Sequence, residues 1–265
     1  MALTKFGGGG DCTPPRRVWK PQVFQGYQIR MGHNGRKIEI TGAQSLIQWT
    51  TDSLPSLHKR WSEHFAGVDG RIQAWTFVPK DILDRVLAGE IQECPVDCSE
   101  EDSNFRLAYQ WMMESMDLAG IEGRKPGISP WWCWITVGDG HTKPTDRHSD
   151  DSTVLLELSI DPAEVLLSDF GMWHVPLNYW FNAEDEAEEA FEKELEAAGL
   201  NIYRTKPLPE PYHSRVQQSW LKVFALDEVN GYTDPIERKG IQGVFWKLSP
   251  NMIKGVTTPD IYIDE

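Results

Sequence analysis

The spacing of apolar and polar residues divides this chain into short strand-like and helix-like segments. Alternating patterns and runs of β-branched or aromatic residues predict strands at 23–31, 36–41, 72–77, 131–137, 153–160, 165–167 and 241–248. Apolar residues three and four positions apart predict helices between several of these strands. Together the segments predict an α+β fold, a mixed β-sheet with flanking helices, preceded by a β-hairpin-plus-helix appendage.

The predicted helices begin at or beside residues that favour a helix start. These residues are Ser53, Pro79, Ser99, Asn182, Ser214 and Ser249. The helix after Ser53 has Pro55 in its first turn and an apolar stripe of Leu57, Trp61 and Phe65. In the helix capped by Asn182, which ends near Gly199, the pattern predicts a buried stripe. Its members are Ala187, Ala190, Phe191, Leu195 and Ala198.

Composition shifts along the chain predict four segments. Residues 1–20, rich in Gly and Pro, are expected to form a flexible basic arm. Residues 21–70 form the appendage, in which Asn34-Gly35 marks the tight turn of the hairpin. Residues 71–257 are the main domain, and 258–265 a C-terminal tail.

Charge is distributed unevenly and narrows the range of partners. The net charge is −14, yet residues 1–60 carry nine Lys and Arg against three Asp and Glu, so the rest of the chain carries −20. Such a body repels nucleic acid, which makes direct DNA or RNA binding by it unfavourable and fits a partner with a basic surface.

No apolar run is long enough for a membrane span, and the few scattered cysteines fit a cytoplasmic protein.

The helix after Asn182 supplies much of this negative charge. Its sequence carries eight acidic residues against the single Lys193. A charged run of this kind fits either a solvated face or a partner-binding face. Under the second interpretation Glu188, Glu192 and Glu196, one helical turn apart, are the candidate partner-binding residues.

Tryptophan is unusually abundant, with twelve in the chain. Large rings of this kind serve mainly as core, and we expect Trp111, Trp134 and Trp220 to be buried. The alternative is a stacking surface for a base or a nicotinamide. Both interpretations remain open from the sequence.

Two groups of residues could carry chemistry. Cys94 and Cys98, with His141 and His148, have a spacing that zinc sites use, but no second close pair accompanies them, so no metal site is predicted.

Asp169, His174 and Asn178 fall near one another in a segment interrupted by Pro176. They could orient a base or bind a polar ligand, or serve as a helix cap and a packed histidine. The usual motifs of nucleotide hydrolases, dinucleotide-binding folds and common hydrolases are absent from the sequence.

Several motifs in order along the chain resemble a known family. They lie at 72–76, 108–112, 166–178, 219–224 and 241–246. Between about 71 and 257 the chain resembles a tryptophan-rich domain of unknown function found in bacteria and their phages. The resemblance brings no activity with it. Because the chain shows no complete set of catalytic residues, we expect an acidic, phage-derived protein that binds and modulates a host protein and needs no cofactor.

A second resemblance is to ADP-ribosyltransferase-like domains. The strand with Trp75 and Thr76 leads into a helix ending at Gly89, and a late strand carries Gln242. The resemblance implies NAD as cofactor, with Trp75 stacking on the nicotinamide and Thr76, Gln242 and Asn178 bonding polar groups. His174 and Asp169 would complete a catalytic set beside two adjacent strands. At Gln242 the chain lacks the carboxylate that such enzymes use, because an amide cannot stabilise an oxocarbenium-like transition state by charge.

Overall fold

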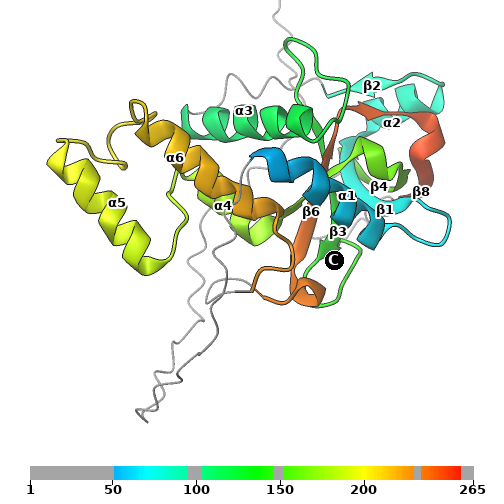
Figure 1. Cartoon of the computed structure of the whole chain (residues 1–265). Coiled ribbons are helices and arrows are strands. Elements are labelled where there is room, and N and C mark those ends of the chain that lie inside the picture. Colours follow the sequence, from blue (N-terminus) through cyan, green and yellow to red (C-terminus); the bar gives the residue numbers. More distant parts are fainter. Residues whose placement is uncertain (1–50, 95–102, 146–151, 230–233, 258–265) are drawn as a thin grey trace, which may run out of the picture.

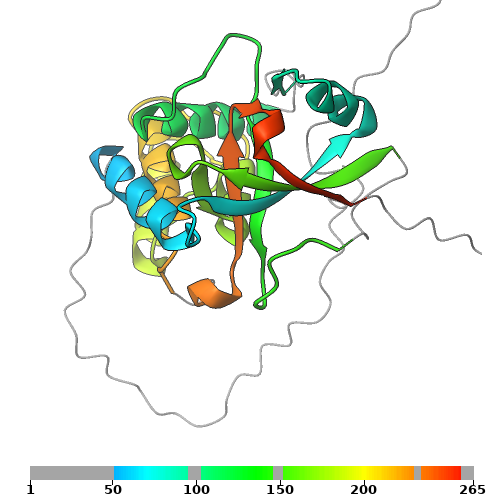
Figure 2. The ribbon, with the colours of Figure 1, turned by 90° about the vertical axis from the view of Figure 1, so that its right-hand side faces the viewer.

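The computed structural model describes residues 51–94, 103–145, 152–229 and 234–257. The predicted hairpin at 23–41, the arm and the tail lie outside these ranges. Within them the α+β prediction is confirmed: helices flank a six-stranded sheet, and a two-stranded sheet accompanies it. Figures 1 and 2 show α1, α3, α5 and α6 together on one side of the main sheet. Helix α2 and strand β2 lie away from this group of helices.

The main sheet has the order β5-β6-β3-β1-β4-β8, and every pairing in it is antiparallel. The strands are β1 (Ile72–Pro79), β3 (Trp131–Val137), β4 (Thr153–Ile160), β5 (Leu166–Asp169), β6 (Gly240–Phe245) and β8 (Ile253–Thr257). The small sheet pairs β2 (Gln92–Glu93) with β7 (Lys247–Leu248). Because β1 and β3 are central, residues on them are held from both sides.

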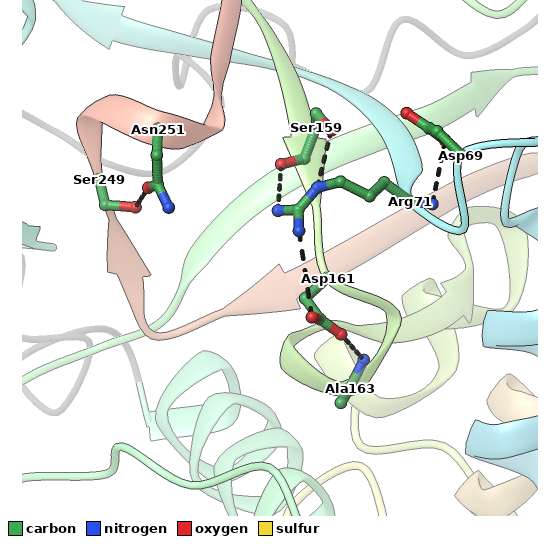
Figure 3. A network of polar contacts seen from close by, with 7 residues as sticks. All are labelled: Asp69, Arg71, Ser159, Asp161, Ala163, Ser249 and Asn251. Carbon is green, nitrogen blue, oxygen red and sulfur yellow. Dashed lines mark hydrogen bonds and ion pairs between the residues drawn. The ribbon is translucent and has the colours of Figure 1, made fainter.

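The register of β1 against β4 is held at one end by Arg71. Its Nε donates to Ser159 Oγ and its Nη2 to the Ser159 carbonyl, each at 2.9 Å, and Asp161 lies 4.0 Å from Nη1 (Figure 3). These contacts join the start of β1 to the end of β4, next to the pair Ile72 and Ile160. A slip of one residue would turn every side chain of β1 to the other face, so this contact helps to decide which side chains face the helices.

The helices are α1 (Leu54–Phe65), α2 (Lys80–Leu87), α3 (Ser103–Leu118), α4 (Phe170–Leu177), α5 (Asp185–Ala197) and α6 (Tyr212–Ser219). A 3-10 helix, η5 (Trp220–Phe224), continues α6. Helix α1 starts after Ser53 with Pro55 in its first turn, as predicted, and buries Leu57 and Trp61. These side chains belong to the same hydrophobic core as the main sheet, so α1 packs as part of that core.

Aromatic rings join the helices of this layer to one another. Trp111 of α3 stacks on Trp173 of α4 at 6.5 Å between centroids and on Phe224 at 5.3 Å, and meets Trp220 edge-on at 5.5 Å. Both Trp111 and Trp220 are buried, as predicted. Trp134 is only partly buried and lies outside the core cluster, so the expectation of a core role for it is wrong.

Two segments differ from their predicted form. Residues after Pro250 were expected to form a short helix, but one 3-10 turn (Pro250–Met252) is followed by the strand β8, which pairs with β4. Ile, Val and Thr predominate in β8, and β-branched side chains favour a strand once an open sheet edge is available. Helix α5 begins at Asp185 after Glu184, and not at Asn182.

The predicted buried stripe of α5 is narrower than expected. Phe191 and Leu195 are buried, whereas Ala187, Ala190 and Ala198 are exposed. Figure 1 shows α5 at the outer edge of the helical layer, and within α5 only Phe191 and Leu195 are buried. Most of its surface is therefore available for its acidic side chains.

Candidate functional site

A cavity of about 430 Å³ lies between α4 and α5. Its walls come from four consecutive stretches of chain: Gly171, Met172, His174 and Val175 of α4, the connection Trp180–Ala183, then Glu188, Phe191 and Glu192 of α5, and Ile202 and Tyr203 beyond it. The cavity therefore brings together His174, Glu188 and Glu192, which the sequence assigned to two different hypotheses. Glu196, one turn further along α5, is exposed and does not line the cavity.

The connection between α4 and α5 is fixed by the protein interior. Trp220 Nε1 donates to the Trp180 carbonyl at 2.7 Å, and the Asn182 backbone N–H donates to Ser219 Oγ at 3.0 Å. Tyr179 turns the chain with a positive φ of 57°, and its buried hydroxyl accepts from the Leu208 N–H at 3.0 Å. These contacts hold one wall of the cavity in place, which favours a site that exists before any ligand arrives.

The electrostatics of the cavity are dominated by carboxylates. Partial burial raises the pKa of Glu188, and the neighbouring Glu192 and Asp185 raise it further. Partial burial also raises the pKa of Tyr203, together with the charges of Glu192 and Glu188 and a hydrogen bond to Glu192. Like charges that disfavour one another's ionised form make a site that gains from a bound cation.

Aromatic and polar side chains form a row across the main sheet, apart from this cavity. Glu157 is opposite Trp75, Trp75 is opposite Trp134, and Gln242 lies between Trp134 and Ser168. Paired residues of antiparallel strands point to the same face, so all five side chains share one face of the sheet. Ser168 Oγ is buried without a hydrogen-bond partner in the described structure.

This row corrects one sequence-based expectation. The strands carrying Trp75 and Gln242 were expected to lie side by side, but β3 separates them. The two Cα atoms are therefore about 10 Å apart, two strand spacings. Trp134 fills the gap, and its ring meets Phe170 at 4.8 Å between centroids; Phe170 in turn meets His174 at 5.2 Å.

The other predicted site residues have structural contacts. Thr76 is buried and donates to the Trp132 carbonyl at 2.7 Å. Asp169 caps α4 by accepting from the Met172 N–H at 3.1 Å, which confirms its predicted alternative role as a helix cap. Its other oxygen lies 2.9 Å from Nζ of buried Lys239. Asn178 ends α4 and donates to the His174 carbonyl at 2.7 Å.

The model of one known protein family matches most of the described residues. The model of a family described as Domain of unknown function (DUF3841) matches residues 91–254, more than half of the chain. The chain belongs to this family. The match confirms the resemblance to a domain of unknown function. No curated protein and no solved structure matches the chain.

The cavity residues and the row on the sheet differ in how far the DUF3841 match covers them. Every residue of the α4–α5 cavity lies inside the DUF3841 match, whereas Trp75 of the row lies before it.

Among the described residues no group of three His, Cys, Asp or Glu is arranged to hold a metal ion. Cys94 is buried and His141 exposed, while Cys98 and His148 lie outside the described ranges. None of the described helices combines the length and apolar character that crossing a bilayer requires.

Sequence reasoning missed Tyr203, Asn182 and Glu157 as site residues, and it expected Trp134 to belong to the core. Tyr203 reaches the cavity because the chain folds back after α5, and Asn182 because the connection between α4 and α5 forms one wall. Glu157 is polar within the apolar strand β4, and this interruption was the one local signal available. Its neighbour across the sheet depends on strand order, which the sequence does not display.

Proposed function

We propose that this DUF3841 protein is a cytoplasmic, phage-derived binding protein that engages and modulates a host protein through a basic surface on that partner. The observation that carries the proposal is the exposed acidic side of α5. Seven of the thirteen residues of α5 are acidic. Helix α5 also lies at the periphery of the protein (Figure 1), where a partner has access to it.

The charges of α5 are only partly neutralised within the described chain. Lys193 pairs with Glu189 at 3.3 Å and Arg215 with Glu194 at 2.7 Å. No pairing of this kind is recorded in the described structure for Glu188, Glu192 or Glu196, which follow one another at four-residue spacing. Like charges at this spacing cost about 0.2–0.5 kcal/mol per pair in a helix. A basic partner removes that repulsion on binding, and its arrival is accelerated by long-range attraction.

The test compares two triple variants of equal net charge. In the first, Glu188, Glu192 and Glu196 are changed to Lys. In the control, the exposed Glu122, Glu164 and Glu237 are changed to Lys. Binding of arginine-rich and lysine-rich peptides is measured by biolayer interferometry at low and high salt, with a glutamate-rich peptide of the same length as a blank.

We expect the first variant to lose binding and the control to keep most of it. The wild-type association rate should fall steeply with salt, because exposed charges are screened beyond about 8–10 Å at physiological ionic strength. Equal losses in both variants would show a non-specific charge effect. Unchanged binding by the α5 variant would reduce its acidic side to a solvated face.

A second candidate, an ADP-ribosyltransferase-like enzyme using NAD, is favoured by the row on the sheet. Trp134 is partly exposed, so it is better placed than buried Trp75 to stack on a nicotinamide ring. Glu157, beside Trp75, supplies a carboxylate that the sequence lacks at Gln242. In such a transfer the bond from the ribose C1′ to nicotinamide breaks, nicotinamide leaves, and an acceptor nucleophile bonds to C1′ and loses its proton.

This candidate is tested by calorimetry with NAD and by assay of released nicotinamide. We expect NAD to bind without measurable turnover, since Glu157 is engaged by Gln73 Nε2 at 2.6 Å and lies three strand spacings from Gln242. Trp134→Ala should abolish that binding, whereas Trp180→Ala, which removes an exposed tryptophan outside the row, should not. No heat of binding at millimolar NAD removes this candidate.

A further inference from the structure

We infer that the α4–α5 cavity takes the guanidinium group of one arginine side chain from the basic partner. This inference rests on the proposed function and names the part of the partner that enters the protein. The cavity, at about 430 Å³, lies within the usual range of small-ligand sites and has room for one long side chain with its adjoining main chain.

The walls combine aromatic rings with carboxylates. Trp180 is 46% exposed and Tyr203 is 62% exposed, so both rings are open to an incoming group. Glu188 and Glu192 line the α5 side of the same cavity. A guanidinium is planar, stacks on aromatic faces and donates two parallel hydrogen bonds to a carboxylate, whereas an ammonium is a compact, strongly hydrated charge. Open rings beside carboxylates therefore favour arginine over lysine.

The protein already binds one of its own arginines in this way. The guanidinium carbon of Arg215 lies 4.7 Å from the ring centroid of Phe191, and its Nη1 lies 2.7 Å from Glu194 Oε2. One aromatic ring and one α5 carboxylate thus suffice to hold a guanidinium beside this helix. Phe191 is buried against Arg215 and Phe181, so an incoming group meets Trp180 and Tyr203 instead.

An unpaired donor in the wall indicates what accompanies the guanidinium. The Asn182 side-chain nitrogen is buried and has no hydrogen-bond partner in the described structure. A buried donor without a partner is unfavourable, because it has lost its hydrogen bonds to water and gained none in return. After a turn of the Asn182 side chain towards the cavity, the main-chain carbonyl of the partner's arginine would supply the missing acceptor. The raised pKa of Glu188 agrees with this arrangement, because a bound cation offsets the repulsion from Glu192.

The inference is tested on the full chain with N-acetyl-arginine amide as probe. N-acetyl-lysine amide and N-acetyl-citrulline amide are the comparison probes, citrulline being nearly the same shape without the charge. Binding is followed by amide chemical shifts in two-dimensional NMR. Two variants keep every charge: Tyr203→Ala removes an open ring, and Ala183→Leu fills the cavity. Phe105→Ala, which removes an exposed ring on α3, is the matched control.

We expect the arginine probe to bind best and to shift the signals of Ala183 and Tyr203. Tyr203→Ala and Ala183→Leu should each weaken its binding at least about fivefold, the lower end of a lost cation–aromatic contact in a partly desolvated site. Phe105→Ala should not change it. Equal affinity for the lysine or citrulline probe, or binding unaffected by both cavity variants, overturns the inference.

The outcomes separate this inference from the proposed function. If basic peptides bind the wild type and fail with the α5 triple variant, while the arginine probe leaves the cavity signals unchanged, the inference fails and the acidic surface stands. If the arginine probe occupies the cavity but no basic peptide binds, the cavity site stands and the partner-binding role of α5 fails.

Discussion

The buried pair of Lys239 and Asp169 gives the sharpest test of how the start of β6 is joined to the junction of β5 and α4. The side chains are 3% and 5% exposed, with Nζ and Oδ2 2.9 Å apart. This contact lacks hydrogen-bond geometry, so charge rather than a directed hydrogen bond holds it. Nζ also donates to the Glu228 carbonyl at 2.8 Å. Lys239 thereby links the approach to β6 with the junction of β5 and α4.

Changing Lys239 to Met keeps most of the side-chain volume and removes the charge. Asp169 is then left as a buried carboxylate whose remaining recorded contact is the cap to the Met172 N–H. Breaking a buried ion pair in this way costs about 3–5 kcal/mol. For a chain of this size each kcal/mol lowers the melting temperature by roughly 2–4 °C, so we expect a fall of about 6–20 °C.

The assay is thermal and urea unfolding of Lys239→Met, Asp169→Asn and the double variant. Asparagine caps a helix about as well as aspartate, so the double variant keeps the start of α4 without a buried charge. We expect it to be more stable than the Lys239→Met variant alone. A loss below about 1 kcal/mol in Lys239→Met, or a double variant as unstable as the sum of the single ones, refutes the reasoning.

Three further results are expected. Trp111→Ala should cost about 3–5 kcal/mol in urea unfolding and Trp134→Ala clearly less, because Trp134 lies outside the core cluster; equal losses would contradict the packing. Gly243→Ala should cost about 1–3 kcal/mol, since its Cβ would lie 2.6 Å from Val165 Cγ2; an unchanged midpoint would show that β5 can shift. Because the pKa of Glu188 is raised, its protonated form stabilises the fold at low pH, and this contribution is lost as pH rises through that pKa. The stability of Glu188→Gln relative to wild type should therefore increase with pH, measured by urea unfolding across a pH series.

The sequence determined the elements whose signals are local. Helix α1 was predicted from Ser53, Pro55 and a stripe at helical spacing, and α2 from its bounds at Pro79 and Gly89. Strands β1, β3 and β4 were predicted within two residues of their observed ends. Such signals act over one or two helical turns or one strand, so no distant contact is needed to form them.

Tertiary structure decided what depends on distant partners. Residues 253–257 became a strand because β4 offered a free edge, although their apolar spacing also fitted a helix. The acidic helix and His174 were identified from the sequence as separate features, and only the return of the chain after α5 placed them around one cavity with Tyr203. Likewise, Trp134 came to lie between Trp75 and Gln242 through strand order alone. Local periodicity tells which face of an element is apolar, but pairing between remote strands and helices decides which faces meet.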